Sequence, residues 1–164
     1  PNGIAGGLTL GGDLTLDTNG IYLGGTGSAN YLDDYEEGTY TANLLIGSGS
    51  VTQSESTLSY VKIGKKVTIT GRIRIDTVSS PSGAVDLPLP FVMETTSFGR
   101  NEIGCFGCAP FNLTNIDTDT VFLRADEGLS KAFIRNFSGT TEVDVGSNLT
   151  ANCGFRFSFT YTTD

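Results

Sequence analysis

The stretch FRFSFTYT, residues 155–162, decides the fold class. Aromatic rings at Phe155, Phe157, Phe159 and Tyr161 alternate with arginine, serine and threonine. Because alternate residues of an extended strand point to the same face, the four rings share one face and need another layer to cover them. The stretch therefore predicts a β-strand with one face in a core and the other in water.

The segment KVTITGRIRID, residues 66–76, has the same alternation. The expected apolar face holds Val67, Ile69, Gly71, Ile73 and Ile75, and the expected polar face holds Thr68, Thr70, Arg72, Arg74 and Asp76. This pattern is typical of an antiparallel strand with one buried face. The alternating residues 57–63 precede it, so we predict a pair of strands joined by a turn at Gly64 and Lys65.

Further alternating segments predict strands at residues 39–46 and near 98–109, 119–126 and 130–137. The polar run at 47–57 is predicted to be a loop, and SSPSG at 79–83 a turn. VDLPLPF at 85–91 holds two prolines, which cannot donate to a strand ladder, so we predict an edge or a short crossover there. Without a convincing helical segment, the chain is predicted to be all-β, with a jelly-roll-like antiparallel β-sandwich head at residues 39–164.

A different pattern occupies residues 6–25, GGLTLGGDLTLDTNGIYLGG. Leu-Thr-Leu occurs at 8–10 and again at 14–16, and Ile-Tyr-Leu follows at 21–23. Each unit reads as a short strand closed by Gly, Asp or Asn, and a single unit is too small to bury its own apolar side chains. We therefore expect residues 1–30 to form a short β shaft in which several chains intertwine.

Between these two patterns lies YLDDYEEGTY, residues 31–40, with carboxylates at Asp33, Asp34, Glu36 and Glu37. Neighbouring residues of a strand point to opposite faces, which suits a catalytic pair of carboxylates poorly. Several chains together would bring many carboxylates near one axis, so a Ca²⁺ site is an alternative. The interpretation we favour is a hydrated acidic connector at residues 31–38 between the shaft and the head.

The composition excludes several kinds of site. The chain has no histidine, which removes imidazole bases and imidazole metal ligands. Its three cysteines, Cys105, Cys108 and Cys153, cannot complete a zinc site without another ligand. We therefore expect these thiols to be small apolar residues of the core, and we predict no catalytic residues, no cofactor and no metal centre.

The charge also restricts the partners. The formal net charge is −8, which repels a phosphate backbone, so we expect no nucleic-acid partner. No apolar run approaches the length of a transmembrane helix, so we expect no membrane insertion. The chain begins with Pro1 instead of an initiator methionine, which leads us to expect that it is part of a longer protein.

Three phrases, in this order, resemble the C-terminal head region of bacteriophage tail fibres and related virion fibre proteins. They lie at Tyr31–Thr41, Tyr60–Ile73 and Leu89–Phe91. Members of that group commonly show YLDDYEEGTWTP, then Y-x-K-I-G-x-x-V-x-x-x-G-R-I, then L-P-F. This chain departs from the first phrase, because Tyr40 stands where Trp is common and Ala42 where Pro is common.

The resemblance implies a homotrimer whose β-sandwich head lies at the tip of a tail fibre and attaches the virion to its host. Our leading hypothesis is a non-enzymatic receptor-binding head that recognises a bacterial cell-surface glycan or an outer-membrane receptor. A structural trimerisation or assembly tip that binds no ligand is the second hypothesis. A glycan depolymerase is the third.

Binding residues are expected in loops, because packing occupies the strand faces. The candidates are Arg100, Asn101, Glu102, Arg124, Asp126 and Glu127. Their alternative interpretation is ordinary solvated charge without a ligand.

Overall fold

The computed structural model describes residues 11–12, 21–22, 31–32, 34–95, 102–117 and 120–164. It divides into two compact units, Pro1–Asp34 and Tyr35–Asp164. In the first unit, strand β1 (Ile21–Tyr22) pairs antiparallel with strand β2 (Tyr31–Leu32).

The leucines that predict the shaft, Leu8, Leu10, Leu14, Leu16 and Leu23, lie outside the described residues. The shaft therefore stays a prediction. The second unit begins at Tyr35, inside the predicted connector, and four residues earlier than the predicted start of the head at residue 39.

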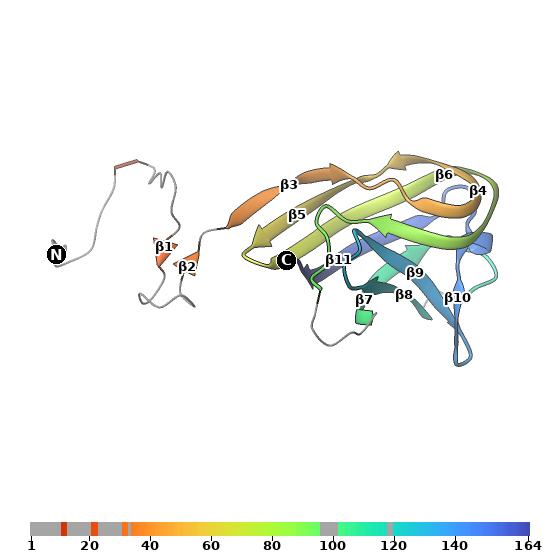
Figure 1. The fold of residues 1–164 in the computed structure, drawn as a ribbon. Coiled ribbons are helices and arrows are strands. Elements are labelled where there is room, and N and C mark those ends of the chain that lie inside the picture. Colours follow the sequence, from red (N-terminus) through yellow and green to blue (C-terminus); the bar gives the residue numbers. More distant parts are fainter. Residues whose placement is uncertain (1–10, 13–20, 23–30, 33, 96–101, 118–119) are drawn as a thin grey trace. The chain divides into compact units, whose positions relative to one another are not determined.

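The second unit is built from strands (Figure 1). They are β3 (Tyr35–Thr41), β4 (Leu45–Glu55), β5 (Thr57–Ile63), β6 (Lys66–Pro88), β7 (Glu102–Phe111), β8 (Val121–Asp126), β9 (Lys131–Ser138), β10 (Thr141–Asp144) and β11 (Gly154–Thr162). A 3₁₀ turn, Gly146–Asn148, lies between β10 and β11. The all-β prediction is confirmed.

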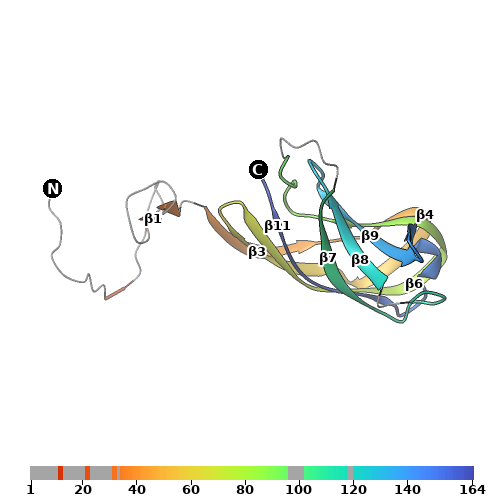
Figure 2. The same cartoon turned by 90° about the horizontal axis from the view of Figure 1, so that it is seen from below.

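Five of these strands close into an antiparallel barrel. The ladder runs from β9 through β8, β7 and β11 to β6, and β6 then pairs back with β9. Closure is possible because β6 is 23 residues long. Its first part, Lys66–Arg74, pairs with β11, and its last part, Val85–Pro88, pairs with β9. Figure 2 shows β7, β8 and β9 from below. The jelly-roll arrangement is not confirmed.

Two further strands, β4 and β5, pair with β6 outside the barrel. β5 pairs with the beginning of β6, and β3 pairs with β5. β4 pairs with the later part of β6, with several register shifts. β10 extends the barrel wall as the second arm of a hairpin with β9.

The alternation of the two strands that predict the fold is confirmed. Phe155, Phe157, Phe159 and Tyr161 of β11 are all buried, and so are the four apolar residues predicted for the inner face of β6. Gly71, which was predicted for the same face, is exposed, and it pairs with Leu58 on one side and Phe157 on the other. Its φ of +145° is rarely adopted by other residues, and a Cβ there would lie 2.7 Å from Leu58 Cδ2.

Two predicted connections are wrong. Residues 47–57 were predicted to be a loop, but most of them lie in β4, and residues 79–83 were predicted to be a turn, but they lie within β6. The two stretches pair with each other, since Ser48 lies opposite Ser82. Gly49 has a φ of +75°, and a Cβ there would lie 2.3 Å from the Ser80 carbonyl oxygen. Small residues therefore permit a bulged ladder that local sequence rules assign to turns.

The edge predicted at residues 85–91 is also wrong. Asp86 pairs with Leu45 on one side and with Phe133 on the other, so this part of β6 is internal. Pro88 is tolerated because it is the last residue of the strand.

Candidate functional site

Strands β8, β9 and β10 present charged side chains on the outer face of the barrel. In β8, Val121, Leu123 and Ala125 are buried, so the intervening Arg124 and Asp126 point outward. β9 alternates in the same way, with Ala132, Ile134 and Asn136 buried and Lys131, Phe133, Arg135 and Phe137 outward. β10 adds Glu142 and Asp144 beside them.

These charges form a connected network, which we call the cleft cluster, with Arg124, Asp126, Arg135, Glu142 and Asp144 as its members. Arg124 Nη1 donates to Glu142 Oε1 at 2.8 Å, and Arg135 Nε lies 3.2 Å from the same oxygen. Arg135 also forms an ion pair with Asp144. Arg124 Nε is 3.3 Å from Asp126 Oδ1. One carboxylate, Glu142, thus bridges two guanidinium groups.

Most of the cleft cluster is shielded from water, whereas Asp144 is 47% exposed. The exposed fraction of the side chain is 13% for Arg135, 21% for Arg124 and 26% for Glu142. Charges interact more strongly in such surroundings than in bulk water, but each also loses hydration. Arg135 Nε is buried and makes no hydrogen bond, although Glu142 lies nearby.

An aromatic ring lies at the base of the cluster. The Phe133 ring centroid is 4.8 Å from the Arg124 guanidinium carbon, 4.9 Å from Lys131 Nζ and 5.1 Å from the Arg135 guanidinium carbon. The face of the ring carries partial negative charge, so it attracts all three cations. Lys131 Nζ also donates to Asp86 Oδ2 at 2.7 Å. The ring and the carboxylates hold these long side chains in place.

A cleft of about 500 Å³ opens above this network, lined by Arg124, Arg135, Glu142, Val143 and Asp144. Phe137 lies directly opposite Glu142 in the register of the hairpin. Its ring stacks on Phe122, with 4.7 Å between centroids, and 45% of Phe137 remains exposed. The cleft itself therefore offers carboxylate acceptors and guanidinium donors. The exposed ring of Phe137 does not line it but lies beside it, next to Glu142 in the hairpin, and the two together suit a polar ligand with an apolar face.

The structure brings two of the predicted site residues together. Arg124 and Asp126 meet in the cleft cluster, but they lie in strand β8 and not in a loop as predicted. Glu127 follows the strand, is half-buried and does not line the cleft. The backbone of Glu102 lies in β7 opposite Asp126. Arg100 and Asn101 lie outside the described residues.

Sequence reasoning missed Arg135, Glu142 and Asp144. A signal was present in KAFIRNFS, residues 131–138, where charged and aromatic residues alternate with Ala, Ile and Asn. A strand whose outward face holds lysine, phenylalanine and arginine is unlike an ordinary solvated strand. The acids of β10 give no such signal, because only the hairpin register brings them to Arg135.

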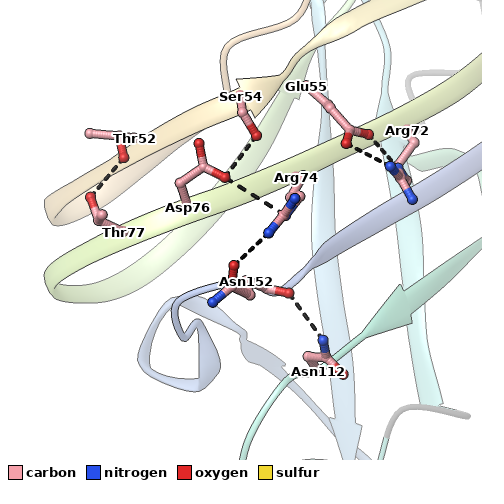
Figure 3. A network of polar contacts seen from close by, with 9 residues as sticks. All are labelled: Thr52, Ser54, Glu55, Arg72, Arg74, Asp76, Thr77, Asn112 and Asn152. Atoms are coloured by element: carbon pink, nitrogen blue, oxygen red, sulfur yellow. Dashed lines mark hydrogen bonds and ion pairs between the residues drawn. The ribbon is translucent and has the colours of Figure 1, made fainter.

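A second charged cluster lies on β4 and β6 and on Asn152, which precedes β11 (Figure 3). We call it the β4–β6 network. Arg72 forms a bidentate ion pair with Glu55. Arg74 Nη2 donates to Asn152 Oδ1 at 2.6 Å. Ser54 Oγ donates to Asp76 Oδ1 at 2.7 Å. These side chains are exposed; that of Arg72, for example, is 46% exposed. None of them lines the cleft described above.

The acidic segment does not gather its carboxylates in the described structure. Glu36 and Glu37 are adjacent in β3 and exposed. Glu36 accepts a hydrogen bond from Tyr60, and Glu37 accepts one from Tyr35 at 2.5 Å. Each carboxylate raises the pKa of its tyrosine, because the hydrogen bond favours the neutral phenol. Asp34 is half-buried, and Asp33 lies outside the described residues.

Among the described residues, no group of three or more Cys, Asp or Glu side chains could hold a metal ion. Cys108 and Cys153 are free thiols, and Cys105 belongs to β7. Burial raises the pKa of the Cys108 thiol to about 12, which keeps it protonated and unreactive at neutral pH. Within the same residues, no helix has the length and apolar character needed to cross a bilayer.

Comparison with known proteins shows that the fold of this chain is similar to part of a solved structure. No protein-family model and no curated protein matches the chain. Among solved structures, the chain is similar to the crystal structure of the Dettilon tailspike protein (gp208), with a TM-score of 0.53 and 16% sequence identity. The match covers 78% of this chain and 24% of that protein. At this identity the likeness describes a shared β fold, and the chain spans about a quarter of the tailspike's length.

Proposed function

We propose that this chain is a receptor-binding head of a bacteriophage tail fibre or tailspike, located at the tip, which attaches the virion to a bacterial cell-surface glycan. The observation that carries the proposal is the cleft above Arg124, Arg135, Glu142 and Asp144, with the exposed ring of Phe137 beside it. Ion pairs that serve stability alone do not need to line a cleft of this size.

Two further observations support the proposal. The barrel is similar in fold to part of a tailspike protein. The phrases at Tyr31–Thr41, Tyr60–Ile73 and Leu89–Phe91 resemble those of virion fibre heads. We further propose a homotrimer, because the Leu-Thr-Leu units at 8–10 and 14–16 have more apolar side chains than one short strand can bury. Three copies of a weak site would together bind strongly.

We propose that attachment is non-enzymatic. The cleft carboxylates Glu142 and Asp144 are each held in an ion pair with arginine, an arrangement that does not suit a proton donor. A structural assembly tip without a ligand is the second candidate, because the described strands of the head also form a complete barrel. A glycan depolymerase is the third.

The test is adsorption of the purified, fluorescently labelled chain to a panel of bacterial strains. A receptor-binding head is expected to bind a subset of strains and to release no oligosaccharide from them. Retention on no strain would support the assembly tip, and release of soluble oligosaccharide would support a depolymerase. Light scattering on the same sample tests the trimer, and a monomer of 17.3 kDa at micromolar concentration would contradict it.

A further inference from the structure

We propose that the cleft between β8, β9 and β10 binds an uncharged pyranose unit of the glycan, with the sugar ring against Phe137 and its hydroxyl groups on Glu142 and Asp144. This inference rests on the proposed function and deepens it, because it assigns the place and the chemical class of the ligand. It also excludes acidic sugars as the preferred ligand.

Phe137 supplies the apolar part of the site. Its ring is held in a fixed orientation by stacking on Phe122, at an interplanar angle of 18°. Almost half of Phe137 stays exposed, although it is a large apolar side chain that would gain free energy from being covered. A pyranose has one face of C–H groups, which can cover such a ring and leave the hydroxyl groups at its edge free to reach polar partners.

The acceptors lie next to that ring. Glu142 is directly opposite Phe137 across the hairpin, and Asp144 is two residues further along the same face of β10. Asp144 is 47% exposed and has lone pairs beyond its ion pair with Arg135. Arg135 fixes both carboxylates in position before a ligand arrives. Hydroxyl donors of a sugar can then bind with little further ordering of these side chains.

The charge of the cleft favours a neutral ligand. Two guanidinium groups, from Arg124 and Arg135, face the three carboxylates of Asp126, Glu142 and Asp144. Both cations are therefore already neutralised by this protein's own acids. The carboxylate of an acidic sugar would approach Asp144, the most exposed charge of the cluster, and would be repelled. The net charge of the whole chain, −8, adds to that repulsion.

The size of the cleft agrees with this assignment. Its volume of about 500 Å³ falls within the range of roughly 300–1,000 Å³ that small-ligand sites occupy. The cleft is shallow and open to solvent, so a longer glycan can continue beyond the bound unit.

The binding test uses methyl glycosides of glucose, galactose, mannose and N-acetylglucosamine, together with methyl galacturonide as the acidic probe. Saturation-transfer NMR on the intact chain at millimolar sugar should detect at least one of the four neutral glycosides and should rank it above galacturonide. Phe137→Ala should weaken that binding about tenfold, which corresponds to about 1.4 kcal/mol. Asp144→Asn, which keeps the shape but removes the charge, should weaken it severalfold.

Matched controls separate binding from folding. Val92→Ala removes an apolar side chain of nearly the same exposure, 46%, and Asp76→Asn removes a paired carboxylate from the β4–β6 network. Both should leave binding unchanged. A thermal melt of each variant shows whether the barrel is intact.

The inference is overturned if galacturonide alone binds, if no neutral glycoside binds, or if folded Phe137→Ala and Asp144→Asn both bind normally. Adsorption of the unmutated chain to bacteria keeps this failure distinct from failure of the proposed function. If the chain and both variants adsorb equally to cells, the function stands and the site is wrong. If the unmutated chain adsorbs to no strain, the proposed function fails as well.

Discussion

The two charged clusters of this barrel use the same residue types in different surroundings. In the β4–β6 network, Arg72, Arg74 and Asp76 are 37–46% exposed, and their partners lie on neighbouring strands or turns (Figure 3). In the cleft cluster, Arg124 and Arg135 are 13–21% exposed and share one carboxylate. Water screens the charges of the β4–β6 network. The arginines of the cleft cluster have lost much of their hydration and depend on the neighbouring carboxylates in its place.

The difference shows why an ion pair alone does not identify a site. Exposed pairs contribute little to stability and can be exchanged for water at little cost. In the cleft cluster, Arg124 and Arg135 are shielded, cannot be rehydrated easily, and are held against the ring of Phe133. Because of this shielding, a mutation in the cleft cluster should lower the stability of the barrel more than one in an exposed pair. The same shielding holds the polar groups in fixed positions, as a binding cleft requires.

The largest expected effect comes from Arg135→Met in the cleft cluster. Removing the guanidinium leaves Asp144 without its arginine partner and leaves Glu142 with Arg124 alone. We expect the free energy of unfolding to fall by about 2 kcal/mol, between the values for buried and exposed pairs. Urea denaturation followed by tyrosine fluorescence measures it. The matched variant Arg74→Met should lose less than about 1 kcal/mol, and equal losses in both variants would remove the distinction between the clusters.

A smaller effect is expected in double-mutant cycles on one pair from each cluster. Arg124→Met with Glu142→Gln should give a coupling free energy of about 1 kcal/mol, since the pair is shielded and 2.8 Å apart. Arg74→Met with Asp76→Asn should give less than about 0.5 kcal/mol, because that pair is exposed and 3.7 Å apart. Urea denaturation of the seven proteins, with the unmutated chain shared by both cycles, provides both values. A larger coupling in the exposed pair would reverse the comparison.

The smallest expected effect is a pH dependence of the stability that the Glu55–Arg72 pair of the β4–β6 network contributes. The hydrogen bond from Arg72 holds the pKa of Glu55 below its usual value. The resulting stabilisation is present above the pKa of glutamate in the unfolded chain, about 4.3, and is lost as the pH falls through the lower folded-state pKa. The difference in urea midpoint between the unmutated chain and Arg72→Gln should therefore be slight at pH 7 and vanish near pH 3.

High salt provides the control for this acid dependence. Because the pair is exposed, 1 M NaCl at pH 7 should reduce the same difference. A difference that persists at pH 3 would mean that Arg72 acts through packing of its aliphatic stem and not through the charge of Glu55.

Part of the candidate site could be read from the sequence. Arg124 and Asp126 are among the residues that the sequence predicts for a binding site, although it places them in a loop and the structure places them in β8. Arg135 could have been added from the outward face of KAFIRNFS, since alternation within one strand is local. Glu142 and Asp144 could not, because their place depends on which residues of β10 lie opposite Phe137 and Arg135.

The sequence by itself determined which faces of the strands are buried. The rings of Phe155–Tyr161 and the apolar residues of Val67–Ile75 alternate with polar ones, and the two-residue period of a strand converts that order into faces without reference to the rest of the chain. Tertiary structure alone decided the closure of the barrel. Val85 meets Ile134, and the Ser- and Gly-rich β4 becomes a strand against β6, because a ladder needs a partner and no local pattern specifies a partner distant in the sequence.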